Sequence, residues 1–454
     1  MTRRPDAVFL EGSLLRHVTV MALSGTAGLG FTFLVDFLAL WWISRLRDEV
    51  LIAAIGFAGT IQFAVISVAI GMMIGAVALV SRALGQGERD RARRIASAAM
   101  VMTFLIQGVV AALVFVYRHE VLALGGAEGE ARDAAARFLA ITLPSLPVMA
   151  LGMVASAVLR AVGDALRSMS VTMAAGAAAA ILDPLLIVWM GLGIEGAGIS
   201  MLLARLVMTV VGLHFAINVH DMLARPRLPD AATMARPFFA IALPAVATQV
   251  STPFGNWILT RAMAEHGESA VAGWGVVMRL TILAFGGIFA LSGAIGGIIG
   301  QNYGAGHYDR VERAFGAALL YCLVYTLLVW AGMAAFGDAI AASFGLSAEG
   351  AAVVHTFTRY AAGAFVFTGA LFVANASFNN LGRPLWSTGA NWLRDGVMMF
   401  PAAMALGAAF AGPGVIWAQA LVNIVAGALA AWLAWRYIRR LGRPRETGLP
   451  AAAE

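Results

Sequence analysis

The sequence contains no lysine: all 31 of its basic residues are arginine, and charged residues of either sign make up only 12% of its 454 residues. A soluble domain carries about 25% charged and about 45–50% apolar residues, whereas this chain is 61% hydrophobic. So few charges cannot cover the surface of a soluble protein of this length. The composition therefore excludes a water-soluble enzyme, a disordered chain and a nucleic-acid-binding protein.

Residues that bind metals or form disulfides are also scarce. The single cysteine, Cys322, excludes an intrachain disulfide and a cysteine-based metal cluster. The seven histidines show no close metal-ligand spacing, so we expect no metal site, no cofactor and no enzyme activity. The segments GQGERDRARR and GQNYGAGHYDR lack the GxxxxGK[ST] spacing of a phosphate-binding loop, so we expect no nucleotide binding either.

Long apolar stretches are abundant instead. Runs of about twenty or more apolar residues recur from end to end, which indicates an all-α polytopic membrane protein. We expect twelve transmembrane helices, at residues 14–44, 50–81, 95–117, 136–159, 168–190, 196–219, 237–264, 270–300, 314–336, 351–380, 386–408 and 414–437. The breaks between them are too short to hold a separate soluble domain.

The arginines are distributed unevenly between the two sides. The even-numbered breaks and the termini carry twenty of them and the odd-numbered breaks carry six. Arginine-rich loops stay in the cytoplasm, so we expect both termini to be cytoplasmic, in a bacterial-type inner membrane. Arg3 and Arg4 precede an apolar run that is too long for a signal peptide.

The second half of the sequence repeats the first at an offset of 219 residues. SRALGQGERDRARR (81–94) aligns with GQNYGAGHYDRVER (300–313), and AVLRAVGDALRS (157–168) aligns with ASFNNLGRPLWS (376–387). Two motifs that share one offset predict a duplicated six-helix unit, with lobes at 1–225 and 226–454. Six crossings return the chain to its starting side, so the two repeats are parallel, which is typical of transporters. The small-residue spacings Gly71-x-x-x-Gly75 and Gly296-x-x-x-Gly300 predict close helix packing.

At these residues the chain resembles the multidrug and toxic compound extrusion (MATE) transporters over nearly its whole length. The matching segments are VDFLALWWISRL, GQGERDRARR, LRAVGDALRS, LDPLLI, IGGIIGQNYGAG, NWLRDGVMMFP and VIWAQALVN, in this order. The resemblance implies two six-helix lobes around a V-shaped central cleft. It also implies a secondary active antiporter that exports amphipathic, often cationic organic compounds in exchange for H⁺ or Na⁺. The partners implied are small organic substrates and the lipid bilayer, and we expect a monomer.

Two lone acids are the candidate cation-coupling residues. Asp36 lies deep in the first span and Asp183 in the fifth, each without a cation one helical turn away. A charge in mid-membrane costs at least about 2.5–3.5 kcal/mol on insertion scales, so such acids are usually functional. An acid in this position can take up and release a proton, or bind Na⁺ through its oxygens. Pro184 follows Asp183 and removes a backbone donor, which predicts a hinge. The alternative is that each acid only caps or hydrogen-bonds a neighbouring helix.

The MATE resemblance is closer to the DinF-like and archaeal branch, which places its coupling acids at these two positions, than to the NorM branch. The positions of the NorM acids hold neutral residues here, near Thr252 and Thr368, and Asp36 maps onto Gly255 in the repeat. The coupling should therefore reside in the N-terminal lobe, and H⁺ is favoured over Na⁺. The branch often has an asparagine where this chain has Ala179, so the surroundings of Asp183 should differ.

Other membrane-embedded polar residues leave alternatives open. Rival salt bridges would join Asp36 to Arg205, or Asp183 to Arg279. Arg394 and Asp395 are adjacent and so should not share a helix face; we expect each to find a separate partner. A cleft dominated by Arg205, Arg279 and Arg359 would favour the alternative function, a flippase for lipid-linked oligosaccharides or lipids. The candidate substrate-cleft residues are Gln62, Gln249, Asn256, Asn375 and Asn379.

Overall fold

The computed structural model describes residues 7–44, 49–225 and 227–441, and within these ranges it contains helices and no strand. The α-helices are α1 (Leu14–Ser44), α2 (Glu49–Gly85), α3 (Arg89–Val116), α4 (Arg118–Leu124), α5 (Gly129–Thr142), α6 (Leu146–Ala161), α7 (Ala165–Asp183), α8 (Gly193–His214), α9 (Leu228–Ala264), α10 (Glu268–Ala284), α11 (Gly286–Gly304), α12 (Tyr308–Ser343), α13 (Ala348–Arg359), α14 (Phe365–Asn380), α15 (Pro384–Trp392) and α16 (Met399–Leu441).

Short irregular turns interrupt several of these helices. Three are 3₁₀ turns, namely η1 (Val8–Leu10), η2 (Leu143–Ser145) and η5 (Ala361–Ala364). Three are π-helical turns, namely η3 (Pro184–Trp189), η4 (Phe215–Val219) and η6 (Leu393–Met398). Proline accounts for η2 and η3, because Pro144 and Pro184 cannot donate the backbone hydrogen bond that would continue the preceding α-helix.

Twelve membrane crossings follow from these elements. Ten helices in the described ranges are long and apolar enough to cross, and α10 with α11 adds an eleventh crossing bent by 48°. The last of the ten, Pro384–Leu441, has 58 residues, which would be about 87 Å at 1.5 Å per residue and is far more than the hydrocarbon thickness of about 30 Å. Ala411, with φ 55° and ψ −144°, breaks this segment into two crossings. The expected twelve spans are confirmed.

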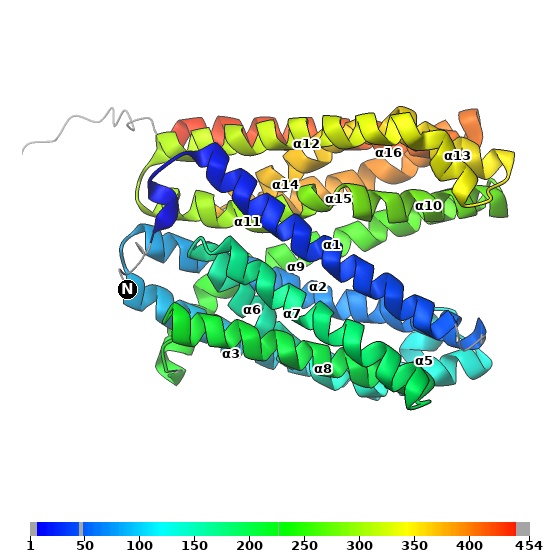
Figure 1. Cartoon of the computed structure of the whole chain (residues 1–454). Helices are drawn as coiled ribbons and strands as arrows, with labels where there is room; N and C mark the ends of the chain where they lie inside the picture. The colour runs from blue at the N-terminus through cyan, green and yellow to red at the C-terminus, as the bar shows by residue number, and fades with distance from the viewer. Residues whose placement is uncertain (1–6, 45–48, 226, 442–454) are drawn as a thin grey trace, which may run out of the picture.

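The helices form two bundles, which meet at one end and diverge at the other (Figure 1). We call α2–α8 the N-terminal bundle and α9–α16 the C-terminal bundle. Helix α1 runs diagonally between them (Figure 1). Near its start, Gly25 packs against Ala290 of α11, and farther along Phe31 and Val35 pack against Gly176 of α7. A movement of α1 would therefore change packing contacts with both bundles.

The duplicated motifs have the same backbone geometry in both halves. Gly87 and Gly306 have φ of 76° and 75°, and Gly163 and Gly382 have φ of 86° and 82°. In all four turns, the amide after the glycine donates to the carbonyl five residues before it, at 2.8–2.9 Å. Such left-handed helix ends favour glycine because a side chain there would be strained. The repeat at an offset of 219 is therefore a structural repeat.

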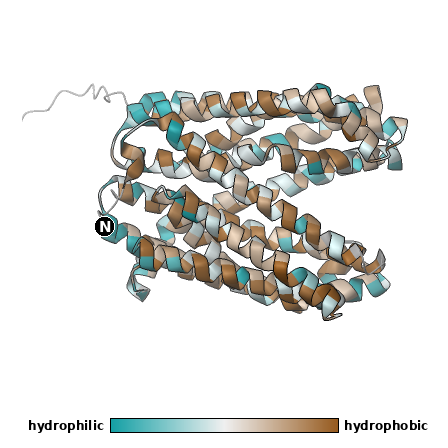
Figure 2. Ribbon diagram, viewed as in Figure 1, coloured by the Kyte–Doolittle hydropathy of each residue, from teal (hydrophilic) through white to brown (hydrophobic). Residues whose placement is uncertain are grey.

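The hydropathy of the surface follows the long axis of the bundles. Hydrophilic residues gather mostly at the two ends, and the lengths of the helices are mainly hydrophobic (Figure 2). Large apolar side chains such as Phe37, Leu105 and Leu328 are exposed along the helices. This surface suits lipid, which agrees with the expectation drawn from composition.

Candidate functional site

Asp36 lies on the stretch of α1 that packs against α7. Its neighbour Val35 is buried, because it contacts the face of α7 where Gly176 leaves room. The next residue along a helix points to another side, and Asp36 is accordingly exposed. Its carboxylate has no hydrogen bond or ion pair with any described residue. Asp36 therefore has no cation beside it among the described residues, and its role in coupling stays a prediction.

Asp183 is the last residue of α7 and is only 4% exposed. The hydroxyl of Ser200 on α8 lies beside it and has no hydrogen-bond partner among the described residues. Asp36 and Asp183 are close enough for their like charges to repel each other. Pro184 begins the π-helical turn η3 directly after Asp183, so the expected break in this helix is present. The structure thus brings the two acids and the helix break together.

The two rival salt bridges do not form among the described residues. The Arg205 guanidinium is buried and donates instead to Gln62 Oε1 at 2.5 Å, to Ser145 Oγ at 2.8 Å and to the carbonyl of Thr142 at 2.9 Å. Arg279 is exposed on α10 and has no ion pair with a described residue. No guanidinium of a described arginine therefore pairs with Asp36 or Asp183 in this conformation.

Arg394 and Asp395 pair with each other, so the expectation of separate partners was wrong. Arg394 Nε donates to Asp395 Oδ1 at 2.7 Å and its terminal nitrogen donates to Oδ2 at 2.8 Å, with both side chains buried. Both residues lie in the π-helical turn η6, whose wider winding changes the angle between neighbouring side chains. Ser251 of α9 donates to Asp395 Oδ2 at 2.9 Å. This carboxylate is fully partnered.

The repeat relates this pair to the acids of the N-terminal bundle. At the offset of 219, Asp36 corresponds to Gly255, and Gly176 corresponds to Asp395. A Cβ on Gly255 would lie 2.8 Å from Asp395 Oδ1, so the missing side chain is what admits this carboxylate. In the C-terminal half the carboxylate on η6 faces a glycine of α9, whereas in the N-terminal half Gly176 of α7 faces Phe31 and Val35 of α1 and not Asp36.

The amides proposed for the substrate cleft divide into two groups. Gln62, Asn375 and Asn379 are buried, Gln62 bonds Arg205, and Asn375 accepts a hydrogen bond from Asn391 at 3.0 Å. Gln62 and Asn375 thus join helices within a bundle, whereas Asn379 Oδ1 is buried without a hydrogen-bond partner among the described residues. Gln249 and Asn256 of α9 are half-buried. They remain predictions for the cleft.

Two equivalent hydrogen bonds, one from each half of the repeat, join the bundles at the end where they meet. Arg82 Nε donates to the carbonyl of Asn380 at 2.7 Å, and Gln301 Nε2 donates to the carbonyl of Ala161 at 2.6 Å. Gln301 is the equivalent of Arg82, and Asn380 is the equivalent of Ala161, at the offset of 219. We call these two contacts the latch. It joins α2 and α6 to α11 and α14, and so ties the two bundles together.

Glycines let the latch helices approach closely. A Cβ on Gly85 would overlap the carbonyl oxygen of Gln301, and one on Gly304 would overlap that of Arg82. These two glycines are also equivalent in the repeat. Toward the membrane interior, Gly71 and Gly75 of α2 pack on α9, and Gly296 and Gly300 pack on the side chains of α14 and α2. The close packing expected from the small-residue spacings is confirmed.

Phe9 covers the latch from outside the helices. Its amide donates to Gln301 Oε1 at 3.0 Å, and its carbonyl accepts from Asn302 at 3.2 Å and Arg310 at 3.0 Å. Its ring is 1% exposed and lies against Gly163, in the turn between α6 and α7. The sequence patterns do not predict a role for Phe9 or for the latch residues. The offset of 219 does place the latch residues at equivalent positions. The residue types differ at these positions, however, because it aligns an arginine with a glutamine and an alanine with an asparagine.

Asp164 organises the turn between α6 and α7 at the same end. Burial alone would raise the pKa of Asp164, but hydrogen bonds from His220 and from the backbone and side chain of Arg167 lower it well below its ordinary range. His220 Nε2 lies 3.0 Å and Arg167 2.5 Å from Asp164 Oδ2. The carboxylate therefore joins the start of α7 to the segment that follows α8.

The profile of the MatE family matches residues 29–185 and 244–404, once in each half of the chain. These matches cover well over half of the sequence. The chain belongs to the MATE family. It is therefore a membrane transporter of efflux type and not an enzyme, and its two bundles form the V-shaped arrangement expected from the resemblance.

Individual relatives of this MATE protein differ in what they are named for. An FAD transporter of Shewanella oneidensis is 28% identical over 436 residues, which is 94% of each chain. The multidrug export protein MepA of Staphylococcus aureus is 22% identical over 433 residues, which is 92% of each chain.

Solved structures share the fold of this MATE protein. A MOP superfamily transporter from Pyrococcus furiosus superposes with a TM-score of 0.90 at 20% identity, over 98% of this chain and 100% of that one. An outward-facing multidrug resistance MATE transporter gives the same TM-score, identity and coverage.

Proposed function

We propose that this MATE protein is a secondary active antiporter that exports amphipathic organic compounds in exchange for H⁺, or for Na⁺, coupled through Asp36 and Asp183. The observation that carries the proposal is the exposed carboxylate of Asp36, which has no partner among the described residues and lies close to the carboxylate of Asp183. An unpaired acid on a membrane-embedded helix is costly and is a functional-site hypothesis by default.

The packing of α1 suggests how an ion would drive the cycle. When both acids are ionised they repel each other, and this repulsion opposes the packing of Phe31 and Val35 on α7. A proton on one acid, or a Na⁺ between the two, removes the repulsion and lets α1 settle against α7. Because α1 also packs on Ala290 of the other bundle, its movement changes the relation between the bundles. Pro184 and η3 would be the hinge of this movement.

The latch lies at the end that carries the arginine-rich breaks, including Arg89, Arg91, Arg93 and Arg94. We assign this end to the cytoplasm by the positive-inside rule. Arg3, Arg4, Arg45, Arg47, Arg443 and Arg445 also entered the sequence argument and lie outside the described residues. With the latch closed on the cytoplasmic side, the conformation described here is outward-facing.

Transport in proteoliposomes tests the proposal. The wild type, Asp36→Asn and Asp183→Asn are compared under separately imposed pH and Na⁺ gradients, with a fluorescent organic cation as the probe. We expect gradient-driven transport in the wild type to fall at least about tenfold in Asp36→Asn. Asp90→Asn is the matched control, because the side chain of Asp90 is 84% exposed at the cytoplasmic end. Full gradient-driven transport by Asp36→Asn would refute the coupling role.

The flippase alternative receives little support from the arginines that would favour it. Arg205 is buried and bonded within the N-terminal bundle, and Arg359 pairs with Asp338 at 2.7 Å. Only Arg279, of these three, is exposed without an ion pair to a described residue.

A second candidate cargo is suggested by the FAD transporter relative at 28% identity. An anionic dinucleotide would be exported by the same fold with the same coupling acids. Competition between FAD and the fluorescent cation in the proteoliposomes separates the two cargo classes. Inhibition by FAD at low micromolar concentration would favour the dinucleotide.

A further inference from the structure

A pocket with excess positive charge lies where the segment between α8 and α9 meets α3. Its volume is about 90 Å³, and its charged lining residues are Arg94 of α3, Arg225 and Arg227 of the intervening segment, and Asp230 of α9. None of the three guanidinium groups forms an ion pair or hydrogen bond with another described residue. Three arginines against one carboxylate leave a net charge of about +2. Like charges this close repel one another, and an anion in the pocket would relieve that repulsion.

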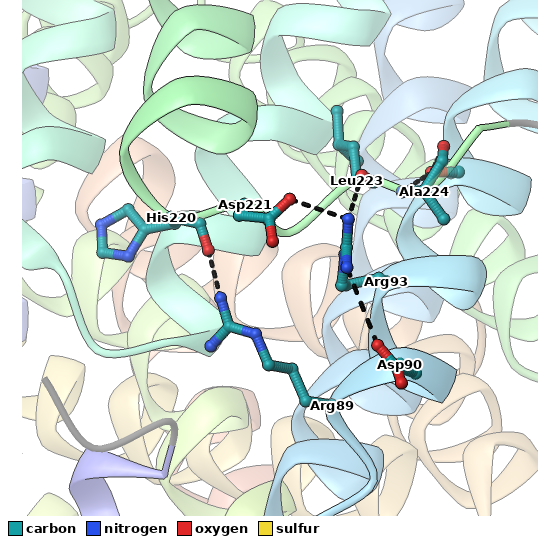
Figure 3. Close-up of polar contacts among 8 residues, drawn as sticks. Arg89, Asp90, Arg93, His220, Asp221, Leu223 and Ala224 are labelled. Carbon is teal, nitrogen blue, oxygen red and sulfur yellow. Dashed lines mark hydrogen bonds and ion pairs between the residues drawn. The ribbon is translucent and has the colours of Figure 1, made fainter. Parts of the chain in front are cut away.

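The segment His220–Arg227, which we call the linker, joins the two bundles and is fastened to α3 along its first half (Figure 3). The fastening contacts join Arg89 to the carbonyl of His220, Arg93 to Asp221 at 2.7 Å and to the carbonyl of Leu223 at 3.3 Å, and Ser97 to the carbonyl of Ala224 at 2.8 Å. The pocket begins where these contacts end. An anion in it would extend the fastening to the second half of the linker.

The pocket continues into an apolar face of α3. Val101 lines the pocket, and Leu105 and Val109 follow at intervals of four residues, each of the two 58% exposed. Residues spaced in this way lie on one side of a helix. From Arg94 to Val109 this face extends about 22 Å, which is enough to accompany an acyl chain through one leaflet of the bilayer.

We propose that Arg94, Arg225 and Arg227 bind the phosphate headgroup of an anionic phospholipid of the inner leaflet, with its acyl chain along Val101 and Leu105. Arginine suits this ligand because its planar guanidinium can donate two hydrogen bonds to one phosphate. The end that we assign to the cytoplasm faces the leaflet surface where basic residues attract anionic lipids. The apolar face distinguishes a lipid from a soluble phosphate, because only the lipid gains from contact with it.

Binding of a short-chain phosphatidylglycerol to the purified full-length protein tests this proposal. The readout is the thermal unfolding midpoint in a zwitterionic detergent, titrated with dioctanoyl phosphatidylglycerol, dioctanoyl phosphatidylcholine or inorganic phosphate. We expect phosphatidylglycerol to raise the midpoint at concentrations at least about tenfold below those at which the other two act. The combined variant Arg94→Gln, Arg225→Gln, Arg227→Gln should weaken this response at least about fivefold.

A matched variant controls for net charge. Arg91→Gln, Arg313→Gln, Arg440→Gln removes three exposed arginines from the same end of the molecule and should keep the wild-type response within about twofold. An equal loss in both triple variants would reduce the site to general charge attraction and overturn the proposal. An equal response to inorganic phosphate would make the pocket a site for soluble anions and would also overturn it.

Should the triple variant fail to fold, single variants and cross-linking keep the test decisive. Arg94→Gln and Arg227→Gln should each weaken the response about twofold to fourfold. A phosphatidylglycerol with a photoreactive acyl chain should label α3 around Leu105 and Val109 in the wild type. Labelling confined to other helices, or unchanged labelling in Arg94→Gln, would refute the assignment. None of these measurements depends on transport, so they stand apart from the proposed coupling role of Asp36.

Discussion

In the N-terminal half, α1 carries the membrane-embedded carboxylate of Asp36, and the neighbouring Phe31 and Val35 fill the room that Gly176 leaves on α7. In the C-terminal bundle the carboxylate comes from η6 and opposes α9, where Gly255 leaves room. Asp36 has no partner among the described residues, whereas Asp395 is held by Arg394 and Ser251. Each half therefore carries a carboxylate on one helix of a corresponding pair (α1 and α7, or α9 and η6), and only the carboxylate on η6 is paired with a described cation.

The comparison shows that an acid in a membrane span can be paired and structural, as Asp395 is, or unpaired, as Asp36 is. The ion pair in η6 has no net charge and Ser251 of α9 also donates to it, so it contributes to the packing of α9. Asp36 has no such ion pair or hydrogen bond with a described residue. On the proposed function, the free acid is the one that can respond to an ion gradient, and the two bundles divide stability and coupling between them.

The largest expected effect is on the side of stability. Arg394→Met should lower the free energy of unfolding by about 3–5 kcal/mol, because it leaves Asp395 as a buried charge without a counter-ion. The double variant Arg394→Met, Asp395→Asn should recover much of this loss, since no lone charge then remains. Thermal unfolding midpoints in detergent measure both. Asp36→Asn, the counterpart in the other bundle, should leave the midpoint nearly unchanged, and a midpoint of Arg394→Met equal to the wild type would contradict the comparison.

The next effect concerns the glycine opposite the satisfied acid. Gly255→Ala should cost about 1–3 kcal/mol of stability, because the added methyl would lie 2.8–3.0 Å from the side chain of Asp395. Gly30→Ala is a matched control on α1, where a Cβ meets nothing within 4 Å. The control should be neutral or slightly stabilising, as alanine favours helices over glycine. Equal midpoints for the two variants would show that the acid can move aside.

Loss of a latch hydrogen bond should change the conformational equilibrium by a free energy similar to, or smaller than, the cost of Gly255→Ala. Arg82→Met should shift the equilibrium away from the closed cytoplasmic end by about 1.5–3 kcal/mol, since Arg82 donates charge-assisted hydrogen bonds to the carbonyls of Asn380 and Asn379. The neutral equivalent, Gln301→Met, should shift it by less unless the contact with Phe9 contributes strongly.

Spin labels on the two equivalent exposed positions measure this shift. The variant Asp90→Cys, Asp309→Cys, Cys322→Ala places one label on each bundle at the latch end and removes the native thiol. Double electron–electron resonance should show a longer-distance population that grows in Arg82→Met. An unchanged distance distribution would mean that the latch residues do not hold the bundles together.

The sequence predicted the number of spans and the repeat well, because apolar length and a fixed offset can be recognised directly in the sequence. It failed at Arg394 and Asp395, because the separation of adjacent side chains was inferred for a regular α-helix and η6 is a π-helical turn. It also missed the latch and Phe9. Hydrogen bonds from side chains to distant carbonyls have no pattern in the sequence, and the repeat preserves the place of the contact but not the residue types.

The smallest expected effect again contrasts equivalent residues. Asp164 caps α7 by accepting from the Arg167 amide at 3.1 Å, whereas its equivalent Arg383 makes no such bond at the start of α15. Because the pKa of Asp164 is lowered on folding, its stabilisation is present above about pH 4 and is lost as the pH falls through the lowered value. Asp164→Asn keeps a capping oxygen and should cost only about 1 kcal/mol at neutral pH. Unfolding midpoints from pH 3 to pH 7 should therefore converge for wild type and variant toward acid, and a constant gap down to pH 3 would place the stabilisation in the cap rather than in the charge.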